Sequence, residues 1–229
     1  MKYLAVIPAR GGSKGIPKKN IYPLLGKPLI EYSLDVIKKV SFDCDVAVSS
    51  DGDEILSVAG KYDGVILIKR PDEISGDRAS TEDALIHAAQ YMKAEYGREY
   101  DAIITLQATS PFRTSETIDA FIKNFESIPG FDAQLTLSKN TTDFWVENED
   151  GTFGRLYPNA PRRRQERKPL YAEDSCLYVT KTEALFSCHS VLGSHCNGFV
   201  IEGREALDIN EPIDLVLAEA MLRDSDLKH

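Results

Sequence analysis

Short apolar runs alternate along the chain with longer segments in which apolar residues recur every three or four positions. The short runs have the length and β-branched content of buried strands, and the longer segments have the spacing of amphipathic helices. The predicted strands cover residues 3–7, 45–49, 65–68, 102–106, 133–138 and 175–180. The predicted helices cover residues 29–40, 53–61, 81–96 and 115–125, with a last helix that holds Leu215 and Leu222. Because strands and helices alternate, the pattern predicts an α/β fold with a mostly parallel central sheet.

The segment 139–170 departs from this alternation. It contains glycines, prolines and the lone Trp145, and it ends in a basic run. The basic residues are Arg162, Arg163, Arg164, Arg167 and Lys168. The segment is too long for an ordinary connection and too polar to form a core of its own. We expect a functional element, a disordered segment or a surface that docks on another chain, with a solvated charge run as the simplest alternative.

Composition and charge narrow the range of possible functions. The chain has 229 residues and a net charge of −9, and no apolar run approaches the ~20 residues of a membrane-spanning helix. An acidic protein is a poor general nucleic-acid binder, which disfavours RNA binding by the basic run. Residues 1–3 lead straight into a predicted strand rather than a signal peptide. We therefore expect a cytoplasmic protein that binds neither nucleic acid nor membranes.

Four cysteines occur in the chain, at positions 44, 176, 188 and 196. None forms a CxxC pair, so reduced thiols are expected. The pairs Cys188-His189 and His195-Cys196 offer zinc-ligating side chains, but adjacent residues of an extended segment point to opposite faces. A loop between two elements is the preferred interpretation.

The loop that follows the first predicted strand concentrates positive charge. Residues 8–20 read PARGGSKGIPKKN and carry Arg10, Lys14, Lys18 and Lys19. Glycines let backbone N–H groups approach an anion closely, and the cations neutralise it. Open α/β sheets bind ligands at the carboxyl ends of their strands. The direct interpretation is a polyphosphate-binding loop.

Two common phosphate-binding motifs are excluded. The loop lacks the GxxxxGK[ST] spacing of a P-loop, and its glycines at 11, 12 and 15 read GGxxG rather than GxGxxG. An NAD-dependent oxidoreductase is therefore disfavoured.

Other predicted strand ends add polar side chains to the same edge. Arg70 follows the third strand, and Gln107 and Ser110 follow the fourth. Thr81 is placed to cap the helix 81–96, and Asp51 to cap the helix 53–61. Near the C-terminus, Asp208 and Asn210 stand two residues apart. Positions i and i+2 of an extended segment face the same way, so both could reach one Mg²⁺ ion.

These motifs resemble those of the acylneuraminate cytidylyltransferases, the CMP-sialic acid synthetases and related CMP-nonulosonic acid synthetases. The resemblance rests on IPARGGSKGIPKKN at 7–20, Arg-Pro at 70–71, LQATSPFR at 106–113 and DIN at 208–210, and it covers most of the chain. It implies a Rossmann-like, three-layer α/β/α nucleotide-diphospho-sugar transferase fold with a mostly parallel central sheet and a protruding dimerisation arm. Residues 1–229 would form a single cytidylyltransferase domain, with 139–170 as the inserted arm of a homodimer.

The resemblance also implies a reaction and its residues. CMP would pass from CTP to the anomeric hydroxyl of a nonulosonic, sialic-type acid, with N-acetylneuraminate as the expected sugar, and pyrophosphate would be released. The expected catalytic residues are Lys19, Arg10 and Asp208. The expected nucleotide-binding residues are Arg10, Ser13, Lys14, Asn20, Arg70 and Thr81. The expected sugar-binding residues are Gln107, Ser110, Asp174 and the partner's Arg164. The expected Mg²⁺ ligands are Asp208 and Asn210.

The chain departs from the family pattern at three places. Ala108 stands where proline is usual, residues 172–175 read Ala-Glu-Asp-Ser instead of Arg-Glu-Asn-Gly, and Asn210 replaces the second aspartate of DID. The change at 172–175 leaves legionaminate or pseudaminate open as the sugar, and Kdo is a further alternative because the opening of the Kdo cytidylyltransferases is similar in outline. Asn210 leaves a non-catalytic CTP-binding module open as an alternative to an enzyme. No residue stands out as a general base.

Overall fold

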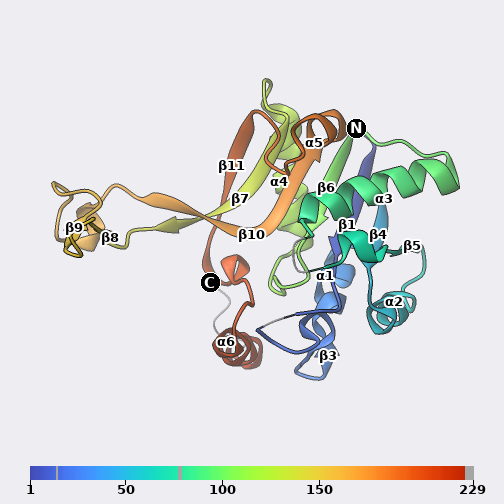
Figure 1. Cartoon of the computed structure of the whole chain (residues 1–229), viewed down its shortest axis with the longest axis horizontal. Helices are drawn as coiled ribbons and strands as arrows, with labels where there is room; N and C mark the ends of the chain where they lie inside the picture. The colour runs from blue at the N-terminus through green and yellow to red at the C-terminus, as the bar shows by residue number, and fades with distance from the viewer. Residues whose placement is uncertain (14, 77–78, 225–229) are drawn as a thin grey trace.

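The computed structural model describes residues 1–13, 15–76 and 79–224. Its centre is a seven-stranded sheet with the strand order β11-β7-β10-β6-β1-β4-β5 (Figure 1). Its strands are β1 (Tyr3–Pro8), β4 (Cys44–Ser50), β5 (Val65–Lys69), β6 (Ala102–Leu106), β7 (Ala133–Asn140), β10 (Leu170–Lys181) and β11 (Cys196–Ile201). Only β10 runs antiparallel to its neighbours in this sheet, so the predicted α/β fold with a mostly parallel sheet is confirmed.

Six helices of at least seven residues connect the strands in the described part of the chain. They are α1 (Leu29–Ile37), α2 (Asp53–Ala59), α3 (Thr81–Tyr96), α4 (Ser115–Ser127), α5 (Thr182–Cys188) and α6 (Pro212–Arg223). The small strands β2 (Pro23–Leu24) and β3 (Lys27–Pro28) form a separate hairpin after the first loop. All six predicted strands and all five predicted helices are present, most with shifted ends, and β6 has the predicted bounds. The sequence pattern missed α5 and β11.

The side chains of β1 alternate between two cores. Ala5 and Ile7 pack in one core with residues of α1, α2 and α4. Leu4 and Val6 pack in the other core with residues of α3 and α5. Successive residues of a strand point to opposite faces, so a fully apolar strand requires helices on both faces. The result is the predicted three-layer arrangement.

The start of α3 corrects one prediction. The N-cap is Ser80 rather than Thr81, because the Ser80 hydroxyl accepts a hydrogen bond from the Asp83 backbone N–H at 3.0 Å. The Asp83 carboxylate in turn accepts a hydrogen bond from the Ser80 backbone N–H at 3.2 Å, which completes a capping box. Thr81 is therefore the first helical residue.

The predicted arm protrudes from one end of the sheet (Figure 1). Strands β7 and β10 stay paired at its base, and β8 (Trp145–Glu147) pairs with β9 (Phe153–Arg155) at its tip. Arg155 holds the tip together by pairing with Asp143 at 2.8 Å. The arm leaves large apolar side chains exposed, including Trp145 and Phe153.

Candidate active site

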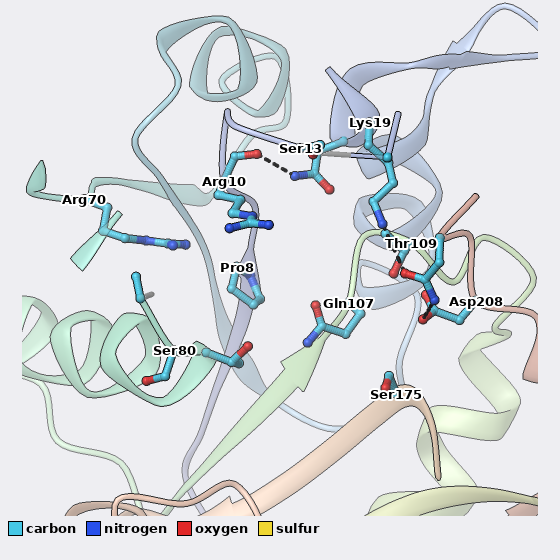
Figure 2. A pocket seen from close by; sticks show the side chains of 15 residues that line it. Pro8, Arg10, Ser13, Lys19, Arg70, Ser80, Gln107, Thr109, Ser175 and Asp208 are labelled. Atoms are coloured by element: carbon cyan, nitrogen blue, oxygen red, sulfur yellow. Dashed lines mark hydrogen bonds between the residues drawn. The ribbon is translucent and has the colours of Figure 1, made fainter. Parts of the chain in front are cut away.

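A pocket of about 560 Å³ lies at the carboxyl ends of the parallel strands. Because β1, β6, β4 and β5 run in the same direction, the loops that follow them meet at one edge of the sheet. The residues that line the pocket are Pro8, Arg10, Ser13, Gly15, Lys19, Asn20, Arg70, Ala79, Ser80, Thr81, Gln107, Thr109, Ser175, Asp208 and Asn210. Figure 2 shows Arg70 and Arg10 reaching in from one side, with Lys19 and Asp208 close together on the other.

The loop after β1 is held in shape by its own polar groups. The Asn20 side chain is buried and donates a hydrogen bond from Nδ2 to the Arg10 carbonyl at 2.9 Å. The Gly11 backbone N–H donates to Asp51 Oδ1 at 2.8 Å. Asp51 was predicted to cap α2, but the N-cap is Gly52 and Asp51 anchors this loop instead.

Lys19 points from this loop towards the segment before α6. Its Nζ donates hydrogen bonds to the Ile209 carbonyl at 2.8 Å and to Asn210 Oδ1 at 3.3 Å. Burial lowers the pKa of Lys19 below the ordinary 10.5, and Asp208 partly opposes that effect. Lys19 is therefore a partly desolvated cation that faces the pocket.

Arg70 is the most deeply buried of the pocket cations, with 5% of its surface exposed. It donates from Nη2 to the Ser49 carbonyl at 2.7 Å and from Nε to the Ser49 hydroxyl at 3.2 Å. Burial lowers the pKa of Arg70, although a guanidinium stays charged in proteins. Together with Arg10 and Lys19 it makes the pocket suited to an anion with several charges.

Asp208 brings a negative charge to the pocket lining. Its Oδ2 accepts a hydrogen bond from Asn210 Nδ2 at 2.7 Å. Its Oδ1 is buried and has no hydrogen-bond partner among the described residues. The intervening Ile209 is fully buried and donates its backbone N–H to the Thr109 carbonyl at 2.9 Å, which fixes the segment. A buried carboxylate oxygen without a donor is a suitable ligand for a hard cation such as Mg²⁺.

The end of β6 is positioned by a buried arginine that sequence reasoning did not single out. Arg113 is 2% exposed and donates from Nη2 to the Gln107 carbonyl at 3.0 Å and to the Ser33 hydroxyl at 2.7 Å. Its Nη1 donates to the Cys176 carbonyl. This side chain therefore ties the pocket residue Gln107 to the neighbouring strand β10.

A bulge in β10 decides which residue of the Ala-Glu-Asp-Ser motif reaches the pocket. The pairing register with β7 shifts between Glu173 and Tyr178, and Ser175 has a left-handed backbone with φ 59°. Ser175 consequently lines the pocket, whereas Asp174 turns inward. Asp174 Oδ1 accepts hydrogen bonds from Thr136 Oγ1 at 2.6 Å and from the Cys176 N–H at 3.0 Å. Burial raises the pKa of Asp174.

Most predicted site residues share this pocket. Those that line it are Arg10, Ser13, Lys19, Asn20, Arg70, Thr81, Gln107, Asp208 and Asn210. Three predicted sugar-binding residues, Ser110, Asp174 and Arg164, are not among the lining residues, so their contacts with the sugar stay predictions. Ser110 is buried, and Arg164 lies on the arm, where its Nε donates to the Thr141 hydroxyl at 2.7 Å. Lys14 lies outside the described residues.

The pocket also holds residues that the sequence analysis did not select. They are Pro8, Gly15, Ala79, Ser80, Thr109 and Ser175. Each is next to or close to a predicted site residue in sequence, so proximity to the motifs was the available signal. Ser175 is adjacent to the predicted Asp174, and the bulge explains why Ser175 rather than Asp174 lines the pocket.

The Cys and His pairs lie elsewhere and have other contacts. His189 Nε2 is 3.0 Å from Asp83 Oδ1, and His195 Nδ1 is 3.0 Å from the Ser194 hydroxyl. Across residues 1–13, 15–76 and 79–224, no three His, Cys, Asp or Glu side chains gather as a metal-binding group. In the same ranges, no helix is long and apolar enough to cross a membrane.

Comparison with known proteins identifies the class of this site. A family model described as cytidylyltransferase matches residues 4–145, which is more than half of the chain. The chain belongs to the cytidylyltransferase family.

Three curated relatives carry more particular names. The chain is 29% identical to pseudaminic acid cytidylyltransferase of Campylobacter jejuni, with 97% of each chain covered. It is 26% identical to CMP-N,N'-diacetyllegionaminic acid synthase of Legionella pneumophila, again with 97% of each covered. It is 24% identical to N-acylneuraminate cytidylyltransferase of Escherichia coli over 95% of this chain and 51% of the relative.

A solved structure supports the fold independently. CMP:2-keto-3-deoxy-manno-octonic acid synthetase complexed with CTP superposes with a TM-score of 0.70 at 18% identity, covering 97% of this chain and 99% of the other. At this identity the likeness concerns the fold.

Proposed function

We propose that this chain transfers CMP from CTP to the anomeric hydroxyl of a nonulosonic acid and releases pyrophosphate. The observation that carries the proposal is the pocket itself, in which Arg10 and Arg70 face Lys19 and Asp208 across a space of about 560 Å³ (Figure 2). The family match and the substrates named for the relatives support the same reaction. Residues 1–229 would act as one cytidylyltransferase domain, with 139–170 as a dimerisation arm.

The proposed chemistry is an in-line substitution at the α-phosphorus of CTP. The anomeric oxygen of the sugar acid forms the new bond to phosphorus, and the bond to the pyrophosphate oxygen breaks. Such transfers depend mainly on positioning and charge neutralisation. Arg10 and Lys19 would neutralise the phosphates, while Asn20, Arg70 and Thr81 would seat the nucleotide. Gln107 and Ser175 would face the sugar acid.

The family typically uses a divalent metal, and the residues present fit one. Asp208 would hold the ion through its buried, unpartnered Oδ1. When bound, the ion would neutralise charge on the triphosphate. The proton of the attacking hydroxyl has no assigned acceptor among the pocket residues, so water is the simplest acceptor.

The test is a substrate panel. Pyrophosphate release would be measured with CTP and Mg²⁺ in the presence of N-acetylneuraminate, pseudaminate, legionaminate, Kdo or no sugar, and CTP binding would be measured separately. We expect release with one nonulosonic acid and test N-acetylneuraminate first. The relatives are named for different sugar acids, and their sequence identities to this chain are similar. The panel is therefore needed to determine the substrate. CTP binding without pyrophosphate release for any sugar of the panel would favour a non-catalytic module. Absence of CTP binding would refute the proposal.

The lowered pKa of Lys19 gives a pH prediction. A lysine whose pKa lies below 10.5 loses its proton at a lower pH than a solvated lysine does. If the charged form binds the phosphates, kcat/KM for CTP falls on the alkaline side before pH 10.5 is reached. Lys19→Arg should remove this fall, because arginine stays protonated. An unchanged alkaline limb in Lys19→Arg would show that another group causes it.

Two exposed apolar surfaces support a homodimer. One is on the arm, and its members are Phe144, Trp145, Val146, Phe153, Leu156 and Tyr157. The other is a stripe on α6 formed by Ile213, Val216 and Leu217, whose spacing places them on one face of the helix. The arm projects away from the body that carries α6 (Figure 1), and both surfaces are exposed among the residues that the structure describes.

The charges around these surfaces are complementary. The arm carries the basic run 162–168, and α6 carries Asp214 and Glu219 with Glu211 as its N-cap. We propose that the arm of one chain packs on the α6 stripe of a second copy. Because α6 directly follows the pocket residues Asp208 and Asn210, this packing would bring the partner's Arg164 towards the sugar site.

Val216→Asp should therefore convert the dimer into a monomer. Val216 is 63% exposed, so the change places a charge in the interface without disturbing the core. The measurement is molar mass by light scattering during size exclusion. Ala94→Asp, an equivalent change at an exposed position of α3, is the control and should remain dimeric. A Val216→Asp variant with the mass of the unaltered dimer would contradict the proposed interface.

A further inference from the structure

Asn210 has a defined contact on each polar group of its side chain. Nδ2 donates to Asp208 Oδ2 at 2.7 Å, and Oδ1 accepts from Lys19 Nζ at 3.3 Å. Its backbone is held as well, because its N–H donates to Asp214 Oδ2 at 2.8 Å. The side-chain amide is thus a bridge between a cation and a carboxylate.

The orientation of this amide is fixed by electrostatics. Oxygen and nitrogen of an amide are assigned from their hydrogen-bond partners. The reverse orientation would place Nδ2 against the Lys19 ammonium and Oδ1 against the Asp208 carboxylate. Two donors or two acceptors would then face each other. Only the observed orientation satisfies both neighbours.

The close packing of the first loop keeps Asn210 in this place. A Cβ atom on Gly15 would come within 2.8 Å of the Asn210 carbonyl oxygen, closer than real Cβ contacts. Glycine at position 15 therefore lets the loop that carries Lys19 approach the segment 208–210. The bridge depends on this approach.

The bridge also sets the local charge. With an amide at 210, the ammonium of Lys19 and the carboxylate of Asp208 balance each other. A second carboxylate at 210 would lose the donor to Asp208 and repel its charge, and the pair would favour an additional cation. Lys19 already brings a positive charge to this point, and Asp208 keeps only Oδ1 for a metal ion.

We propose that Asn210 is a positioning residue rather than a metal ligand. It holds the Lys19 ammonium at a position that a second divalent cation would otherwise occupy. The chain then binds one divalent ion for each CTP. This inference rests on the proposed CTP site and replaces the expectation that Asn210 ligates Mg²⁺.

The experiment counts bound Mn²⁺ by electron paramagnetic resonance in the presence of saturating CTP and no sugar. We expect one Mn²⁺ per chain for the unaltered protein and two for Asn210→Asp. Asn210→Ala breaks the bridge without adding charge and should still bind one. Circular dichroism would confirm that each variant is folded.

Two results would overturn the inference. One is two Mn²⁺ ions per unaltered chain with CTP bound, a measurement that needs no variant. The other is a folded Asn210→Asp protein that still binds one. CTP binding is followed in parallel by calorimetry, so loss of the CTP site itself would be recognised as failure of the proposed function.

Discussion

Replacement of Lys19 by alanine is expected to lower turnover by about 10²–10³-fold, the effect of removing one preorganised charge from a transition state. Lys19 is half-desolvated and held against the Ile209 carbonyl at 2.8 Å, so its charge is fixed before the substrate arrives. The measurement is kcat for pyrophosphate release with the sugar that the panel identifies.

Lys18 provides the matched control because it is the neighbouring lysine of the same loop. Its side chain is 66% exposed and pairs with Glu54 at 2.6 Å, away from the pocket lining. Lys18→Ala should leave turnover within about twofold, since exposed ion pairs contribute little. Equal losses in the two variants would indicate that the loop acts only through its total charge.

Replacement of Arg113 by leucine is expected to lower the free energy of unfolding by about 1–3 kcal/mol. Arg113 is almost fully buried, and its hydrogen bonds go to carbonyl and hydroxyl oxygens of Cys176, Gln107 and Ser33. The change would leave the buried Cys176 carbonyl without this donor, whereas the Gln107 carbonyl would keep the Ser33 hydroxyl, which lies at 3.2 Å. A buried acceptor without a partner carries its full desolvation cost.

Urea unfolding followed by circular dichroism would measure this loss. Arg98→Leu is the control, because the Arg98 side chain is 51% exposed and pairs with Asp45 at the surface. Its expected cost is below about 1 kcal/mol. A similar midpoint for Arg113→Leu and the unaltered protein would show that the buried hydrogen bonds of Arg113 are replaceable.

The layers and most of the pocket could be predicted because they follow from local patterns. Helix α3 ends at the predicted Tyr96, where Gly97 follows in the sequence, although its cap lies one residue before the predicted Thr81. Arg10, Lys19 and Arg70 were recognised because each follows a continuous apolar strand. Parallel strands then bring such residues to one edge without further information.

What could not be predicted depends on contacts between distant segments. β11 is a half-exposed edge strand, and its sequence CNGFVI lacks a regular alternation. The inward turn of Asp174 requires the bulge in β10 and the donors Thr136 and Cys176. The positioning role of Arg113 depends on Gln107 and Cys176 meeting at one side chain, which no local pattern encodes.

The approach of Gly15 to the Asn210 carbonyl has a consequence for how this sequence can change. Any side chain at position 15 would push on the backbone of residue 210, and through it on Lys19 and Asp208. The two segments lie at opposite ends of the sequence yet constrain each other as one unit. Divergence of this chain towards new sugar acids is therefore freer at Ser175 than along the Gly15–Asn210 contact, where viable substitutions must arise jointly.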